Sequence, residues 1–116
     1  MQTRSERIRV LAVIKTLHTA IWAFFAGCIV AIPVAGAQGR FLFAAALTGL
    51  VLVECVVIVA NRGRCPLTDL AARYTDDRAA NFDIYLPRWL AQHNKSIFGT
   101  LFAVGALFTL GRWWLS

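Results

Sequence analysis

Charged residues are scarce in this 116-residue chain. Asp, Glu, Lys and Arg make up 16% of the sequence and hydrophobic residues 59%, whereas soluble domains have about 25% and 45–50%. A soluble domain of this size buries only roughly 60–70% of the surface that its unfolded chain exposes, so it has no means of hiding this much apolar surface. The composition therefore excludes an ordinary soluble domain and predicts that lipid or a partner chain surrounds the protein.

Cysteine is scarce too, and the common catalytic motifs are missing. Cys28, Cys55 and Cys65 are an odd set without a CxxC or a metal-ligand spacing, which does not predict a disulfide scaffold. Cys28 and Cys55 lie inside apolar runs, where we expect them to pack as small apolar residues. The sequence has no nucleophile elbow, phosphate loop, paired catalytic carboxylates or HExxH. Nothing in it predicts an enzyme or identifies a cofactor.

Three long apolar runs are present instead, at residues 17–37, 41–60 and 97–115. At 1.5 Å rise per residue, a helix of about 20 residues matches the hydrocarbon core of a bilayer, about 30 Å thick. We expect an all-α fold, a single membrane domain over 1–116 with three transmembrane helices and short interfacial helices in an inner loop at 62–95. Basic residues before the first run and the Ala35-Gly36-Ala37 stretch also resemble a cleaved signal peptide, but the basic region is long, so we expect the helix to be retained.

The basic residues flank the apolar runs asymmetrically. Ten of the twelve lie on the side of the N-terminus: Arg4, Arg7, Arg9, Lys15, Arg62, Arg64, Arg73, Arg78, Arg88 and Lys95. Because positive charge resists translocation, this predicts a multi-pass protein of a bacterial inner membrane with the N-terminus inside and the C-terminus outside. Trp113 and Trp114 are then expected to anchor the outer interface. The flanking charges also account for the pI of about 10.1 without nucleic-acid binding.

Short connections and small residues predict how the helices pack. Only residues 38–40 separate the first two runs, so these helices should form a tight antiparallel hairpin. Small residues at helical spacing should let the helices approach closely in lipid. These are Ala23, Gly27, Ala31 and Ala35 in the first run, Ala45 and Gly49 in the second, and Gly99 and Ala103 in the third. Pro33 is expected to bend the first helix.

The inner loop should contain two short helices. The first starts at Pro66, which is harmless at the first helical position, and ends before Asp76-Asp77. The second is an amphipathic segment at 81–95 that mixes aromatic and basic residues, as helices in the headgroup region do. Ser96 is expected to cap the third span.

The polar residues in or near the spans are candidates for a site. Glu54 lies inside the second run, where an ionisable group costs about 2.5–3.5 kcal/mol and is usually paired or functional. His18 lies at a comparable depth in the first run, and we expect the two to meet as a structural intramembrane pair or as a proton-transfer, ligand or metal site. If the inner loop folds back, His18, Glu54, Cys65 and His93 would converge at one leaflet as a candidate cofactor site, with groups that suit a metal or haem.

The order of these residues resembles a family of small bacterial membrane proteins of unknown function. That family has a histidine at the start of the first span, a glutamate late in the second, a Cys-Pro-Leu-Thr tract and a further span. The matching residues here are His18, Glu54, the tract Cys65-Pro66-Leu67-Thr68 and the pair Tyr85-Leu86. The sequence departs from the family two residues beyond the threonine, where the family commonly has a glutamate and this chain has Leu70, followed by Ala71. The resemblance implies that His18, Glu54 and Cys65 act together, but it implies no reaction.

Three functions remain open. The first is a structural or accessory membrane subunit whose partners are the lipid bilayer and either a second copy or a larger membrane complex. The second is a redox, metal-binding or haem-binding membrane protein that uses the inner-leaflet cluster. A proton-linked transporter subunit that depends on Glu54 is the third.

Overall fold

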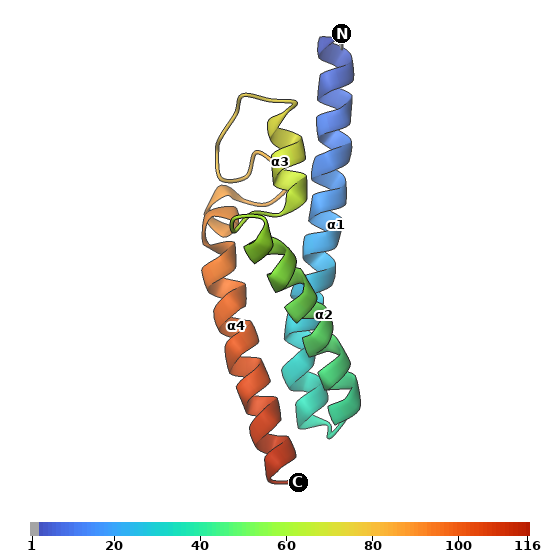
Figure 1. Ribbon diagram of the computed structural model, residues 1–116, viewed down its shortest axis with the longest axis vertical. Helices are drawn as coiled ribbons and strands as arrows, with labels where there is room; N and C mark the ends of the chain where they lie inside the picture. Colours follow the sequence, from blue (N-terminus) through green and yellow to red (C-terminus); the bar gives the residue numbers. More distant parts are fainter. Residues whose placement is uncertain (1–2) are drawn as a thin grey trace. The chain divides into compact units, whose positions relative to one another are not determined.

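A computed structural model describes residues 3–116 of the protein, which form four helices and no strand (Figure 1). The helices are α1 (Arg4–Ala37), α2 (Phe41–Ala60), α3 (Pro66–Ala72) and α4 (Arg88–Trp114). Three of them, α1, α2 and α4, are long and apolar enough to cross a membrane. The expected all-α fold with three candidate spans and a short helix in the connecting loop is confirmed.

Helix α1 begins earlier than expected, at Arg4 rather than near residue 17, and has 34 residues. Thr3 caps its start: the backbone N–H of Glu6 donates to Thr3 Oγ1 at 3.2 Å, and the N–H of Arg7 donates to the Thr3 carbonyl at 3.0 Å. A Thr followed three residues later by Glu is the sequence pattern of a capping box. This signal precedes the apolar run, so the run length alone predicted too short a helix.

Helix α4 also begins earlier than expected, at Arg88 rather than near residue 97. The expected separate helix at 81–95 and the expected cap at Ser96 are wrong: residues 81–87 form turns and bends, and Ser96 lies inside α4. Pro87 explains the boundary, because a proline disfavours the helical conformation of the residue before it. No proline or glycine interrupts residues 88–98, so the helix continues directly into the apolar run.

The short connections around α2 follow from helix-end geometry. The hairpin expected between the first two spans is confirmed, because α1 ends at Ala37 and α2 begins at Phe41. At this end the N–H of Arg40 donates to the Ala35 carbonyl at 2.9 Å and the N–H of Gly39 to the Gly36 carbonyl at 3.2 Å. These are the bonds of a Schellman motif, which requires a left-handed residue, and Gly39 has a φ of 74°.

The short helix α3 is confirmed, with Pro66 in its first turn and Cys65 at its N-cap position. It ends at Ala72, four residues before the Asp76-Asp77 pair that was expected to end it. The chain therefore leaves α3 early and runs without helix to Pro87.

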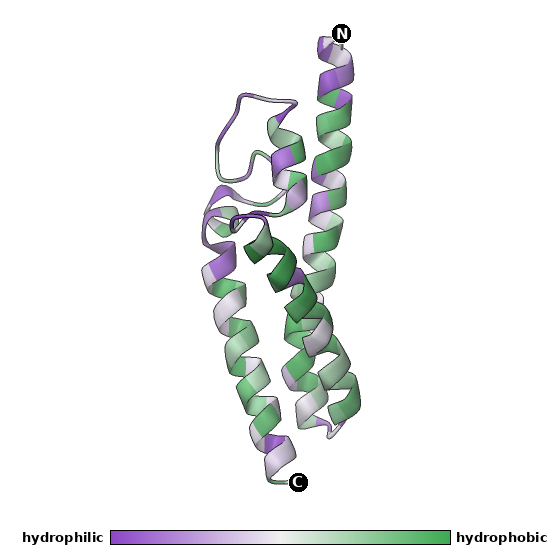
Figure 2. Cartoon of the chain, in the orientation of Figure 1, coloured by the Kyte–Doolittle hydropathy of each residue, from purple (hydrophilic) through white to green (hydrophobic). Residues whose placement is uncertain are grey.

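The chain forms two compact units. Unit 1 comprises Met1–Trp22 and Val57–His93, and unit 2 comprises Ala23–Val56 and Asn94–Ser116. Figure 2 shows hydrophobic residues over most of α2, and hydrophilic residues at the start of α1 and along the loops that flank α3. Unit 1 therefore contains most of the polar connections, and unit 2 contains most of the apolar helix length.

Unit 2 is held together by an apolar core between α1, α2 and α4. The buried members are Cys28, Ile29, Ile32, Leu47 and Val51, and Phe98 and Phe102 of α4 pack against them. Cys28 thus packs as a small apolar residue, as expected. Cys55 is exposed, so its expected packing within the chain is wrong.

The closest backbone approaches in unit 2 lie at other glycines than expected. A Cβ atom placed on Gly27, Gly49 or Gly99 would meet nothing within 4 Å, whereas one placed on Gly36 would lie 2.5 Å from Thr109 Oγ1. A Cβ on Gly105 would lie 3.0 Å from Cδ of Pro33. Of the small residues expected at contacts, Ala35 is buried and Ala31 packs against the core. The spacing of small residues did not separate these from the three open glycines.

Candidate functional site

The polar contacts of unit 1 start from one face of α1. Lys15, His18 and Thr19 are three and four residues apart, so their side chains share a face of the helix. Ile14, one residue earlier, is only 4% exposed, and Ala71 of α3 and Ile84 of the loop are the other buried apolar residues of this unit. Each of the three segments, α1, α3 and the loop, thus contributes one buried apolar residue to unit 1 in addition to its polar contacts.

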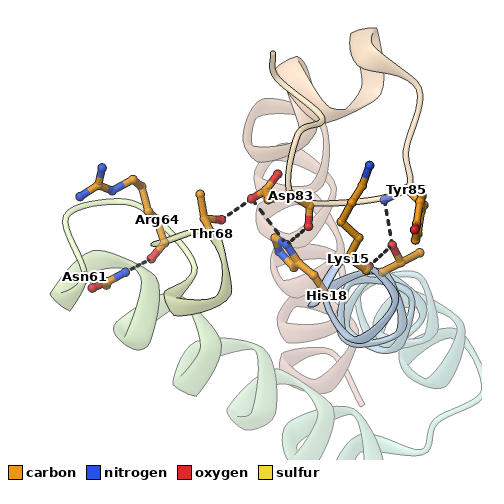
Figure 3. Close-up of polar contacts among 8 residues, drawn as sticks. Lys15, His18, Asn61, Arg64, Thr68, Asp83 and Tyr85 are labelled. Atoms are coloured by element: carbon orange, nitrogen blue, oxygen red, sulfur yellow. Dashed lines mark hydrogen bonds and ion pairs between the residues drawn. The ribbon is translucent and has the colours of Figure 1, made fainter. Parts of the chain in front are cut away.

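Asp83 is the central residue of this cluster, because it is the only charged residue of the described part of the chain that is buried, with 6% exposure. Its carbonyl oxygen lies 3.0 Å from Nδ1 of His18, and its Oδ2 lies 3.5 Å from the same nitrogen. Thr68 of α3 donates its hydroxyl to Oδ2 (Figure 3). One side chain therefore links the loop, α1 and α3, and these partners offset the desolvation of its charge.

The hydrogen bond to the Asp83 carbonyl determines the proton arrangement of the His18 ring. A carbonyl oxygen only accepts, so Nδ1 must carry the proton and donate it. In the neutral ring the basic lone pair then lies on Nε2. Cys65 stands at the N-cap of α3. His18 and Asp83 thus form a connected imidazole and carboxylate pair, and Thr68 of α3 binds the carboxylate.

Two further contacts attach the loop to α1. The backbone N–H of Tyr85 donates to Thr19 Oγ1 at 2.9 Å, and the Thr19 hydroxyl donates to the Lys15 carbonyl at 2.7 Å. Nζ of Lys15 lies 4.5 Å from the centre of the Tyr85 ring, within the range of a cation–π contact. The backbone of residues 83–85 is therefore fixed to α1 on both sides of Ile84 (Figure 3).

The position of Cys65 depends on the turn between α2 and α3. Nδ2 of Asn61 donates to the Arg64 carbonyl at 2.8 Å and to Oδ2 of Asp69 at 2.9 Å. Nε of Arg64 lies 3.3 Å from Oδ1 of Asp69. These bonds join the end of α2 to α3, so residues 61–69 hold Cys65 in a defined place at the start of α3.

The structure gives physical roles to the Cys-Pro-Leu-Thr tract. Cys65 is the N-cap residue of α3, Pro66 occupies the first turn of this helix, and Thr68 binds Asp83. The tract therefore starts α3 and attaches it to the loop through Asp83.

The candidate site residues separate into two groups. His18 and Cys65 both belong to unit 1, whereas Glu54 belongs to unit 2. The expected pair of His18 and Glu54 stays a prediction. His93 is exposed near the start of α4. In the part of the chain that the structure describes, no three His, Cys, Asp or Glu side chains gather as metal ligands would.

Sequence reasoning missed Asp83, although a signal was available. Asp83 stands between Phe82 and Ile84 in a short apolar stretch of the loop. Packing of these apolar neighbours tends to bury the acid between them. The expected amphipathic segment at 81–95 gave this acid no role of its own. Comparisons with protein-family models, with curated proteins and with solved structures found no match to this chain.

Proposed function

We propose that the protein is an accessory subunit of a bacterial inner membrane that acts by packing its spans against a second copy or a larger membrane complex. One observation carries this proposal: a Cβ atom added to Gly27, Gly49 or Gly99 would have no other atom of the chain within 4 Å. In lipid, where apolarity alone gives helices no reason to associate, such positions allow a further helix to approach closely.

The polar cluster of unit 1 supports an accessory role. In residues 3–116 no buried side-chain nitrogen or oxygen lacks a hydrogen-bond partner. The network of Asp83, His18 and Thr68 therefore already has the partners it needs, and it holds the loop against α1. The lateral faces of the spans are different: only 28%, 17% and 11% of the most apolar windows of α1, α2 and α4 are buried.

The size of the assembly in native membranes tests the proposal. We expect the wild-type chain, solubilised mildly and run on a native gel, to migrate above monomer size, and Gly27→Leu and Gly49→Leu to shift it toward the monomer. Val53→Leu is the matched control, because Val53 is 63% exposed but already carries a side chain. A wild-type chain that is monomeric in membranes would contradict the proposal. Reconstitution of the purified chain alone then separates self-association from a larger complex.

The proposed orientation has the N-terminus inside. Nine of the twelve basic residues belong to unit 1: Arg4, Arg7, Arg9, Lys15, Arg62, Arg64, Arg73, Arg78 and Arg88. This distribution supports the orientation because positive charge is retained on the cytoplasmic side. With the native cysteines replaced, we expect a membrane-impermeant maleimide added to intact cells to label Ser116→Cys and not Ser5→Cys. The opposite labelling would invert the proposed topology.

A proton-linked role at Glu54 is a second candidate. Glu54 is half-buried in α2, and no hydrogen bond or ion pair within unit 2 involves it. An intramembrane acid without a partner is a functional candidate by its energetic cost alone. The expected result is that Glu54→Gln abolishes a pH-driven flux in vesicles while the chain inserts normally, with Asp76→Asn as the control outside the spans. An unchanged flux would remove this candidate.

A further inference from the structure

We propose that unit 1 binds the headgroups of anionic phospholipids through exposed arginine side chains. In residues 3–116, six exposed guanidinium groups form no hydrogen bond, ion pair or ring contact, and all six belong to unit 1. They are those of Arg4, Arg7, Arg9, Arg62, Arg73 and Arg88. The three open glycines of the proposed packing surface belong to unit 2, so the lipid surface consists of different residues.

The other six basic residues have contacts within the chain. Arg64 pairs with Asp69, and the guanidinium group of Arg78 donates to three backbone carbonyl groups. Arg112 donates to the last carbonyl groups of α1, and Arg40 lies over an aromatic ring. Both lysines make contacts as well. Guanidinium groups without a contact are therefore confined to one unit, where they are available to a ligand.

The acidic residues of unit 1 do not neutralise these arginines. Glu6 stands three residues before Arg9, and Asp76 stands three residues after Arg73, yet neither acid forms an ion pair in the described part of the chain. The carboxylate of Asp83 is buried and bonded within its own cluster. Unit 1 therefore presents an excess of uncompensated positive charge, which attracts a negatively charged membrane surface.

The backbone of Arg62 points to a ligand outside the chain. Arg62 has a φ of 61°, in the left-handed region that Gly39 occupies after α1. Glycine adopts this conformation without strain, whereas a residue with a Cβ atom does not. No side-chain contact within residues 3–116 accounts for an arginine at this position. Arg62 lies two residues beyond the end of α2, a candidate span, so phospholipid headgroups are within its reach.

Aromatic residues beside Arg88 favour a lipid surface over a soluble polyanion. Arg88 is the first residue of α4, another candidate span. Tyr85 is 53% exposed and Trp89 is 63% exposed, so both rings are open to the surroundings. Tyrosine and tryptophan are enriched at membrane–water interfaces, where their amphipathic rings lie at the level of the headgroups. Arginine and aromatic side chains thus occur together where a span begins.

The choice of arginine over lysine indicates that phosphate is the group recognised. The planar guanidinium group donates two parallel N–H bonds to phosphate oxygens, whereas a lysine ammonium acts as a point charge. Retention of positive charge on one side of a membrane requires the charge alone. All six basic side chains without a contact are arginines. Exchange of arginine for lysine therefore separates headgroup binding from topology.

Competition between two lipids tests the proposal. The purified full chain in dodecyl maltoside micelles is mixed with equal amounts of phosphatidylglycerol and phosphatidylcholine, and native mass spectrometry measures the ratio of the two lipids bound. We expect phosphatidylglycerol to be preferred, and Arg9→Gln, Arg62→Gln and Arg88→Gln each to lower the ratio about fivefold. Arg40→Gln is the matched control in unit 2, because this arginine already has a ring contact. Equal binding of both lipids by the wild type, or an equal loss in Arg40→Gln, would overturn the proposal.

Two further measurements identify the group that is bound. Arg62→Lys keeps the charge and removes the paired donors, so its lipid ratio should lie between those of the wild type and Arg62→Gln. A ratio equal to that of the wild type would refute recognition of phosphate by the guanidinium group. Excess inorganic phosphate should displace no more phosphatidylglycerol than sodium chloride of the same ionic strength. Greater displacement by inorganic phosphate would show that unit 1 binds free anions and would overturn the lipid assignment.

Discussion

Unit 1 and unit 2 are each stabilised by a different kind of internal contact. In the described part of unit 1 the long-range contacts are polar and centre on Asp83, and the buried apolar residues are Ile14, Ala71 and Ile84. In unit 2 the core is apolar, and backbones approach closely at Gly36 and Gly105. Unit 1 thus depends on a few directional bonds, and unit 2 on the fit of many weak contacts. Substitutions should therefore act in different ways in the two units.

The largest effect is expected from filling the closest contact of unit 2. In Gly36→Leu the new Cβ would lie 2.5 Å from Thr109 Oγ1, so α1 and α4 would have to separate. Overpacking typically costs about 1–3 kcal/mol, and we expect the upper end of this range here because the contact is so close. Gly111→Leu is the control, since nothing lies within 4 Å of that Cβ position and Gly111 is not one of the three glycines of the proposed packing surface. The measurement is unfolding of both variants in detergent micelles, and an equal stability would show that the glycine contact is not what holds unit 2 together.

A second substitution at this contact separates sterics from helix propensity. Thr109→Ala removes Oγ1 and Cγ2, two of the three atoms that the new side chain would meet. We expect it to restore part of the stability lost in Gly36→Ala, giving a coupling energy in the double-mutant cycle. Additive effects would place the loss elsewhere than in this contact.

The corresponding test of unit 1 is removal of its central carboxylate. Asp83→Ala leaves the Thr68 hydroxyl without its partner and removes the carboxylate beside His18 Nδ1, whose bond to the backbone carbonyl of residue 83 remains; we expect a cost of about 2 kcal/mol. The loss should be local: amides of α3 and residues 81–86 should lose hydrogen-exchange protection while those of α2 in unit 2 keep theirs. Asp76→Ala is the control, because Asp76 is exposed. Equal loss of protection in both units would show that they unfold together.

The contrast between local and long-range contacts also explains which features could be predicted from the sequence. The three spans, the hairpin at Gly39 and the short helix at Pro66 follow from run lengths and from local rules on glycine and proline, which do not need to know the neighbours. The partner of His18 does not follow in this way, because Asp83 is 65 residues away and its burial depends on how the loop folds. The glycine contacts were missed for a related reason: a helix carries small residues on several faces, and only the packing selects one.

Arg112 tests the contact at the C-terminal end of α1, with a smaller effect. Its Nε donates to the Gly36 carbonyl at 3.0 Å, and its guanidinium also donates to the Ala37 carbonyl at 3.3 Å, so it satisfies the last carbonyl groups of α1. Arg112→Gln should cost about 1 kcal/mol, since these are partly exposed charge-assisted bonds. We expect faster hydrogen exchange at residues 36–40, with Trp114→Leu as a neighbouring control. Unchanged exchange would assign the capping of α1 to Gly39 alone.

The smallest effect concerns the two ends of α2, where one backbone motif occurs with different residues. At the end of α2 the N–H of Gly63 donates to the Ile58 carbonyl at 2.8 Å and that of Arg62 to the Val59 carbonyl at 3.2 Å, as at the end of α1. Arg62 has a φ of 61° where α1 has Gly39. A side chain in this left-handed region costs about 1 kcal/mol. Arg62→Gly should therefore stabilise the chain by about 0.5–1 kcal/mol, and Gly39→Ala should destabilise it by a similar amount. Thermal unfolding in micelles measures both. If Arg62→Gly fails to stabilise the chain, contacts of the arginine side chain must offset the backbone strain.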